Sequence, residues 1–92
     1  PPMGEAPPRW RRILLTGAAG EIGTVIRPAL RGTAESMRLH DLRPVRDLAP
    51  GEVAMDGDIA EPGMAEVAMA GVDCVIHLAG IPREAAGTPE EI

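Results

Sequence analysis

Short apolar runs alternate with segments of helical periodicity along most of the chain. The first run, Ile13-Leu14-Leu15-Thr16, is continuous and ends at a glycine-rich loop, which is typical of a parallel strand buried on both faces. The following segment, 21–30, predicts a helix because apolar residues recur at helical spacing, namely Ile22, Val25, Ile26, Ala29 and Leu30. Pro28 lies inside this helix and removes a backbone hydrogen bond toward Thr24, so we expect a kinked or shortened helix.

The second half of the chain repeats this alternation. It predicts a strand at 36–41, a weak strand at 52–55, a helix from Pro62 to Gly71 and a strand at 73–78. The apolar face expected for this second helix consists of Met64, Val67 and Ala68. Strands that alternate with helices favour an α/β fold with a parallel sheet.

The two ends of the chain carry different signals. Residues 1–8 contain four prolines and one glycine, so we expect 1–11 to form a disordered arm, with Trp10 packed loosely on the edge of the fold. Near the other end, Thr88-Pro89-Glu90-Glu91 is a capping box that opens a helix, and the chain stops at Ile92. Because one helical turn is not stable alone, this pattern suggests a chain truncated after the fourth strand.

The most informative motif is the glycine-rich segment between the first strand and the first helix. Its glycines are Gly17, Gly20 and Gly23. Gly17 permits a tight turn, Gly20 allows the backbone to approach a pyrophosphate, and Gly23 lets helix and strand pack closely. The helix N-terminus then offers N–H groups and positive partial charge to phosphates. In this context the motif predicts a dinucleotide-binding site, the alternative being a plain strand-to-helix turn.

Further candidate residues follow the later strands. Asp41 ends the second strand 18 residues after Gly23, where an acidic residue accepts hydrogen bonds from an adenosine ribose and favours NAD over NADP. Arg43 weakens that preference, because an arginine could bind a phosphate. Asp58 and Ile59 could accept from and cover an adenine, and Leu78-Ala79-Gly80 could let the backbone approach a ribose. Each of these positions has a plainer alternative: a solvated aspartate at a strand end for Asp41, a turn aspartate for Asp58, and a tight strand exit for Leu78-Ala79-Gly80.

Composition excludes several classes of function. A net charge of −5 with no lysine and no basic stripe is a poor match for nucleic acid. There is no apolar run long enough to cross a membrane and no signal peptide in the residues given, and single Cys74 excludes an intramolecular disulfide or a Cys-rich zinc site. We therefore expect a cytoplasmic protein without a metal. Cys74 reads as a core thiol, His77 as a structural group, and His40 has no assigned role.

These motifs together resemble the N-terminal part of the extended short-chain dehydrogenase/reductase family, the NAD-dependent epimerase/dehydratase group, and within it most closely the uronate dehydrogenases. The residues that carry the resemblance are Leu15 to Gly23, Asp41-Leu42, Asp58-Ile59 and His77-Leu78-Ala79-Gly80. The resemblance implies a partial Rossmann fold over 12–92, with strand order 3-2-1-4 and helices on both faces. It also implies NAD as cofactor.

The resemblance further implies a role for each residue. The pyrophosphate would lie mainly along the backbone of Gly17, Gly20, Glu21 and Ile22, and Gly23 would complete the cofactor-binding motif by letting the helix pack closely. Asp41 would hold the adenosine ribose, and Asp58 and Ile59 would hold adenine. Leu78, Ala79 and Gly80 would lie beside the second ribose. Glu21 stands where the family usually has an uncharged residue.

Catalysis in the family uses a Tyr-x-x-x-Lys pair with a Ser or Thr, and this chain has neither tyrosine nor lysine. We therefore expect no catalytic residue here. NAD-dependent oxidation of a sugar acid, or related sugar-nucleotide chemistry, would need a longer parent protein. The alternatives are a stand-alone, non-catalytic nucleotide-binding module and a gene remnant that folds poorly. The oligomeric state is not predicted.

Overall fold

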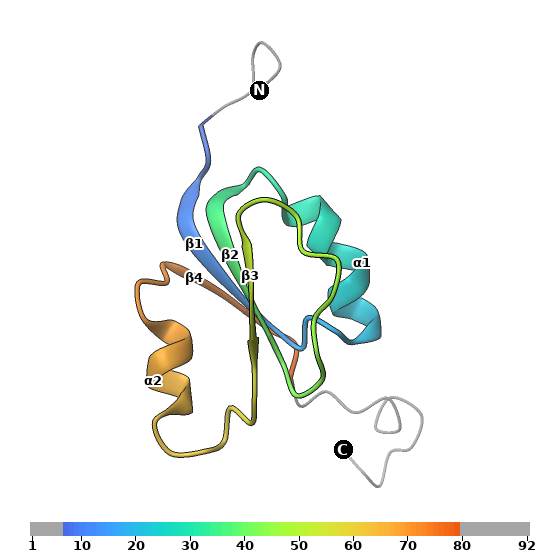
Figure 1. Ribbon diagram of the computed structural model, residues 1–92. Coiled ribbons are helices and arrows are strands. Elements are labelled where there is room, and N and C mark those ends of the chain that lie inside the picture. Colours follow the sequence, from blue (N-terminus) through green and yellow to red (C-terminus); the bar gives the residue numbers. More distant parts are fainter. Residues whose placement is uncertain (1–6, 80–92) are drawn as a thin grey trace, which may run out of the picture.

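The computed structural model describes residues 7–79, which form a four-stranded parallel sheet with one helix on each side (Figure 1). The elements are β1 (Trp10–Thr16), α1 (Glu21–Leu30), β2 (Ala34–Asp41), β3 (Glu52–Asp56), α2 (Met64–Met69) and β4 (Cys74–His77). The strands lie side by side in the order β3-β2-β1-β4. The predicted α/β fold, strand order and placement of helices on both faces are therefore confirmed.

The boundary expected for the N-terminal arm is wrong by two residues. β1 begins at Trp10, because the main-chain N–H groups of Arg9 and Trp10 both donate to the carbonyl oxygen of Thr33, at 2.9 and 3.0 Å. The Trp10 side chain is half-buried and packs against the hydrophobic core, rather than loosely on the edge of the fold. The disorder expected for the earliest residues, and the capping box at Thr88, lie outside the described residues.

The core lies between the sheet and α1. In the parallel register, Ile13 stands beside Met37 and Cys74, and Leu15 stands beside Leu39 and Ile76. Leu14 points to the opposite face and is also only 1% exposed, so β1 is buried on both faces as its continuous apolar run predicted. Cys74 contacts this core, in agreement with its interpretation as a core thiol.

α1 has the predicted limits but a different buried face. Its buried or half-buried positions are Gly23, Ile26, Arg27 and Leu30, which follow the i, i+3, i+4, i+7 spacing of one helix face. Ile22 and Val25, expected on that face, are 54% and 75% exposed. Pro28 does not shorten the helix, because it stands in the last turn and costs only the bond toward Thr24.

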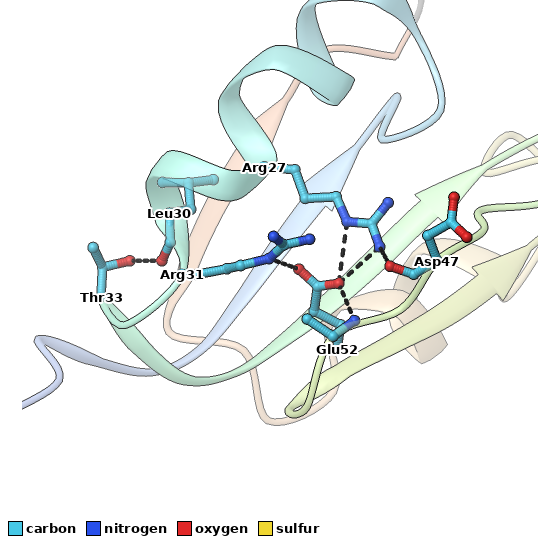
Figure 2. Close-up of polar contacts among 7 residues, drawn as sticks. Arg27, Leu30, Arg31, Thr33, Asp47 and Glu52 are labelled. Atoms are coloured by element: carbon cyan, nitrogen blue, oxygen red, sulfur yellow. Dashed lines mark hydrogen bonds and ion pairs between the residues drawn. The ribbon is translucent and has the colours of Figure 1, made fainter. Parts of the chain in front are cut away.

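Arg27 is buried because it forms an ion pair that joins α1 to the start of β3 (Figure 2). Its Nη2 donates to Oε1 of Glu52 at 2.7 Å and to the carbonyl oxygen of Asp47 at 2.8 Å. Arg31 Nε donates to Glu52 Oε2 at 3.0 Å, and the Ala49 N–H donates to Oε1 at 2.8 Å. These bonds fix the loop between β2 and β3 against the C-terminal half of α1.

α2 covers the other face of the sheet and is shorter than predicted. It begins at Met64 rather than at Pro62, because Gly63 precedes it with a left-handed φ of +83° that ends any helical backbone there. Ala68 is fully buried, whereas Val67, expected on the same face, is 60% exposed. Arg38 of β2 compensates for the lack of a basic residue in the last turn, since its Nη1 donates to the carbonyl oxygens of Val67, Ala68 and Ala70. Among the described residues, no helix has the length and apolar character needed to cross a membrane.

Candidate functional site

A cleft of about 570 Å³ opens at the carboxyl end of the parallel sheet. Its described wall consists of Gly17, Gly20, His40, Asp41, Leu42, Arg43, Asp58, Ile59, His77, Leu78 and Ala79. Seven of these are residues that the sequence marked as candidates, drawn from the ends of all four strands. Three further candidates, Glu21, Ile22 and Gly23, come directly after Gly20 in the sequence but do not line the cleft. Gly80 lies outside the described residues. Ligands of open α/β sheets bind at this edge.

Close backbone neighbours explain two of the glycines in the glycine-rich loop. Gly17 has a φ of +74°, and a Cβ there would lie 2.9 Å from the Ala79 nitrogen. A Cβ on Gly23 would collide with the carbonyl oxygen of Gly17 and approach Ala18 Cα to 2.9 Å. Glycine is therefore needed at 17 for the turn, as the motif predicted, and at 23 for close packing of α1 on the loop that follows β1.

The N-terminus of α1 faces this loop without a side-chain cap. Gly20 is the N-cap residue, and no side chain there accepts a hydrogen bond from the helix. The N–H groups of Ile22 and Gly23 come before the first helical hydrogen bond, from Thr24 to Gly20 at 2.9 Å, and have no acceptor within the helix. Positive partial charge is therefore directed at the cleft, where it would favour an anion.

Asp41 is buried in the wall and holds the loop by hydrogen bonds. Oδ2 accepts the main-chain N–H of Ala19 at 3.0 Å, and Oδ1 accepts that of Arg43 at 2.9 Å. Burial raises the pKa of Asp41. Hydrogen bonds from the N–H groups of Arg43 and Ala19, together with the Arg43 guanidinium, lower it by more, so the pKa lies below its usual value. The carboxylate is therefore ionised, and each oxygen keeps acceptor capacity for a hydroxyl group.

Arg43 also lines the cleft, although from the sequence it was considered only because an arginine there would weaken the preference for NAD over NADP. Its Nε lies 3.4 Å from Asp41 Oδ1, and its side chain is 66% exposed. Its Nη2 lies 3.7 Å from the position that a Cβ would take on Gly20. The guanidinium therefore stands at the entrance to the cleft, between the glycine-rich loop and Asp41. The spacing of two residues from Asp41 was the signal that could have placed it there.

Asp58 lines the cleft, as expected, and also stabilises a turn, which was the alternative interpretation. Its Oδ1 accepts the main-chain N–H of Ala60 at 2.9 Å, which shapes the turn after β3. The carboxylate is exposed, and Ile59 beside it is half-buried. Asp58 thus places an acidic group, and Ile59 an apolar one, on the same side of the cleft.

Thr16 organises the opposite side of the cleft, a role that sequence reasoning missed. Its Oγ1 accepts the N–H groups of Leu78 and Ala79 at 3.0 and 3.2 Å and lies 2.6 Å from Nδ1 of His77. Because two donors already occupy the oxygen, we assign its own hydrogen to Nδ1, which leaves the proton of neutral His77 on Nε2. His77 thus has the structural role expected for it, and Thr16 fixes the backbone that leaves β4.

His40 also lines the cleft, although the sequence assigned it no role. It is 1% exposed, and neither ring nitrogen has a hydrogen-bond partner in the part of the chain that the structure describes. Its carbonyl oxygen accepts the Ala18 N–H at 3.0 Å, so its backbone also ties β2 to the glycine-rich loop. No group of three or more His, Cys, Asp or Glu suited to a metal occurs among residues 7–79.

Comparison with known sequences shows that this chain is similar to one part of several uronate dehydrogenases. No protein-family model matches the chain. The uronate dehydrogenase of Pseudomonas putida is 41% identical over 76 residues, covering 82% of this chain and 28% of that protein. The uronate dehydrogenase of Agrobacterium fabrum is 40% identical over 74 residues. The chain therefore spans about 28% of the length of these curated relatives, and the expected resemblance is confirmed over that part.

Solved structures agree with the sequence comparison. The crystal structure of uronate dehydrogenase from Agrobacterium tumefaciens matches with a TM-score of 0.73 and 40% identity, covering 78% of this chain and 27% of that one. A mutant of that enzyme, solved in complex with NAD, matches with a TM-score of 0.74. Glucuronic acid dehydrogenase from Chromohalobacter salexigens matches with a TM-score of 0.74 at 33% identity. The described fold is thus that of the corresponding part of these dehydrogenases.

Proposed function

We propose that this chain is the NAD-binding portion of a uronate dehydrogenase of the extended short-chain dehydrogenase/reductase type. The observation that carries the proposal is the single cleft in which the glycine-rich loop, Asp41, the Asp58-Ile59 pair and the β4 exit meet. The similarity to an enzyme solved with NAD supports it. We extend the proposal to a cytoplasmic location on the grounds of composition.

The proposal assigns a role to each part of the cleft. The pyrophosphate would lie against Gly17 and Gly20 and the first turn of α1, Glu21 to Gly23, through main-chain N–H groups and the helix dipole. Asp41 would accept the adenosine ribose hydroxyls with the acceptor capacity that Ala19 and Arg43 leave. Asp58 and Ile59 would hold adenine, and Leu78, Ala79 and Gly80 would lie beside the second ribose.

The size and polarity of the cleft fit such a ligand. Ligand pockets have volumes of roughly 300–1,000 Å³, and this one measures about 570 Å³. A side chain on Gly20 would begin 3.2 Å from the Gly17 carbonyl oxygen and would narrow the approach of a phosphate to the loop. Apolar residues and a few polar groups share the wall, as in sites that bury a flat base and orient it.

Bound NAD would supply the hydride acceptor, and the residues of this chain would bind and orient it. The chain contains no tyrosine and no lysine, so none of its residues takes the acid/base roles that the family gives to that pair. Oxidation of a uronate is therefore proposed for a longer protein in which these residues form one part. The proposed sugar-acid substrate would be bound mainly by residues outside this chain.

Calorimetric titration of the folded chain with NAD tests the binding proposal. Ala79→Leu adds bulk to the wall and should weaken NAD binding by about tenfold, equivalent to about 1.4 kcal/mol. Ala65→Leu adds the same atoms to an exposed position of α2 outside the wall, and it should leave binding unchanged. Absence of NAD binding to a chain shown to be folded by its circular dichroism would overturn the proposal.

The activity is tested on the longest protein that the gene encodes. We expect NADH to form when that protein is mixed with galacturonate or glucuronate and NAD. NAD binding without NADH formation from either sugar acid would contradict the dehydrogenase assignment and would favour a non-catalytic nucleotide-binding module instead.

A further inference from the structure

The position of Arg43 affects whether the cleft can bind NADP as well as NAD. Arg43 is the one arginine among the described residues of the wall, and lysine is absent from the chain. Its guanidinium lies between the Asp41 carboxylate, at 3.4 Å, and the Gly20 backbone, with Nη2 3.7 Å from the place of a Cβ. The cleft therefore carries a full positive charge beside the carboxylate that was expected to select NAD.

Asp41 does not depend on the Arg43 side chain for its position. The main-chain N–H groups of Ala19 and Arg43 hold its two oxygens at 3.0 and 2.9 Å. The guanidinium contact is longer, at 3.4 Å, and belongs to a side chain that is 66% exposed. A long contact made by a solvent-exposed side chain contributes little to stability. The guanidinium can therefore turn toward a ligand while the carboxylate stays in place.

The charges of Asp41 and Arg43 decide whether the cleft attracts or repels a phosphate on the ribose. An unpaired carboxylate at this position would repel a 2′-phosphate. Here the charge of Asp41 is offset by an adjacent guanidinium, whose planar set of donors matches the oxygens of a phosphate. On the basis of the proposed function, we infer that Arg43 binds the ribose 2′-phosphate of NADP, so that the cleft accepts NADP as well as NAD.

The same guanidinium could instead reach the pyrophosphate, because it lies beside Gly20. The two contacts have different consequences. A contact with the 2′-phosphate strengthens binding of NADP and 2′-AMP but not of NAD and 5′-AMP. A contact with the pyrophosphate strengthens the binding of NAD and of NADP equally. The ratio of the two dissociation constants therefore separates them.

The experiment is calorimetric titration of the native chain, Arg43→Ala and Arg46→Ala with NAD, NADP, 2′-AMP and 5′-AMP. In the native chain we expect NADP to bind within about tenfold of NAD. Arg43→Ala should weaken NADP and 2′-AMP by about tenfold, as for loss of a charge-assisted hydrogen bond, with NAD changed by less than about twofold. Arg46→Ala removes the same charge from the same loop outside the described wall, and should leave the ratio unchanged.

Two results would overturn the inference while leaving the proposed function intact. One is NAD binding with NADP more than about a hundredfold weaker in the native chain, a difference of about 2.8 kcal/mol. The other is an Arg43→Ala variant that weakens NAD and NADP equally or weakens neither. Failure of the folded native chain to bind either dinucleotide would instead overturn the proposed function and this inference with it.

Discussion

The carboxylate of Asp41 accepts the main-chain N–H of Ala19 at 3.0 Å, across 22 residues of sequence. The residue expected to recognise a ribose therefore also holds the glycine-rich loop in place. A second bond, from the Ala18 N–H to the His40 carbonyl oxygen, ties the same loop to the end of β2. The shape of the proposed phosphate site thus depends on the strand next to the loop.

Replacing Asp41 tests this double role. Asp41→Ala leaves the Ala19 N–H without its acceptor, and we expect a loss of about 1–3 kcal/mol in the free energy of unfolding. Asp41→Asn keeps one carbonyl acceptor and should lose less. Urea denaturation measures both. Asp41→Ala should also shift the ratio of NAD to NADP affinity toward NADP, and equal stability of both variants and the native chain would contradict the structural role.

Glu52 makes the stability of the fold dependent on pH. Burial raises its pKa, but hydrogen bonds from Arg27, Ala49 and Arg31 lower it more, from 4.5 to about 2. Because the folded pKa lies below the unfolded one, the ionised carboxylate stabilises the fold above pH 4.5, and this contribution is lost as the pH falls toward 2. The shift corresponds to about 3 kcal/mol.

Acid denaturation followed by circular dichroism measures this dependence. Glu52→Gln should flatten the fall in stability below pH 4.5 and should cost about 3–5 kcal/mol at neutral pH, because buried Arg27 loses its partner. Arg31→Ala, which removes a partner that is 43% exposed, is the milder variant. Glu35→Gln, at an exposed position of β2, is the matched control, and its stability should fall at low pH as steeply as that of the native chain. A native chain whose stability is independent of pH in this range would contradict the prediction.

Gly23 is required for close packing of α1 on the loop. Gly23→Ala places a Cβ against the Gly17 carbonyl oxygen, and we expect it to cost more than about 2 kcal/mol, as overpacking against rigid backbone does. Gly32→Ala is the control, because its φ is +88° but no atom lies within 4 Å of its Cβ position. The control should cost only the backbone strain of about 1–2 kcal/mol. Thermal unfolding of both variants tests this order.

Thr16 is expected to hold the exit of β4 through its hydroxyl group. Thr16→Val is nearly the same size but leaves the Ala79 N–H without that acceptor, whereas the Leu78 N–H keeps the main-chain carbonyl oxygen of Thr16 at 3.1 Å. We therefore expect a loss of about 1–3 kcal/mol in the free energy of unfolding. NAD binding should weaken as well, since Leu78 and Ala79 line the cleft. Thr16→Ser keeps the oxygen and should retain most of both. A valine variant as stable as the serine variant would show that the hydroxyl is dispensable.

Local pattern was enough to predict most of the fold. A continuous apolar run indicates a strand buried on both faces, and the glycines report on backbone φ and close packing, which are properties of a few neighbouring residues. The errors occurred where a local signal was weak. Pro62 looked like the start of a helix, but the left-handed Gly63 moved that start to Met64. Val25 had helical spacing, yet Arg27 took the buried position on α1.

The sequence by itself therefore determined the parallel α/β arrangement, the glycine-rich loop and the set of strand ends that carry the candidate residues. Tertiary structure alone decided the ion pair of Arg27 with Glu52, the bond of Asp41 to Ala19, the bonds of Thr16 to the β4 exit, and the place of Arg43 beside Gly20. All of these contacts join residues that are more than 20 positions apart, so they depend on the register between strands and on which face each side chain takes. The spacing of apolar residues within one segment does not say which distant segment lies beside it.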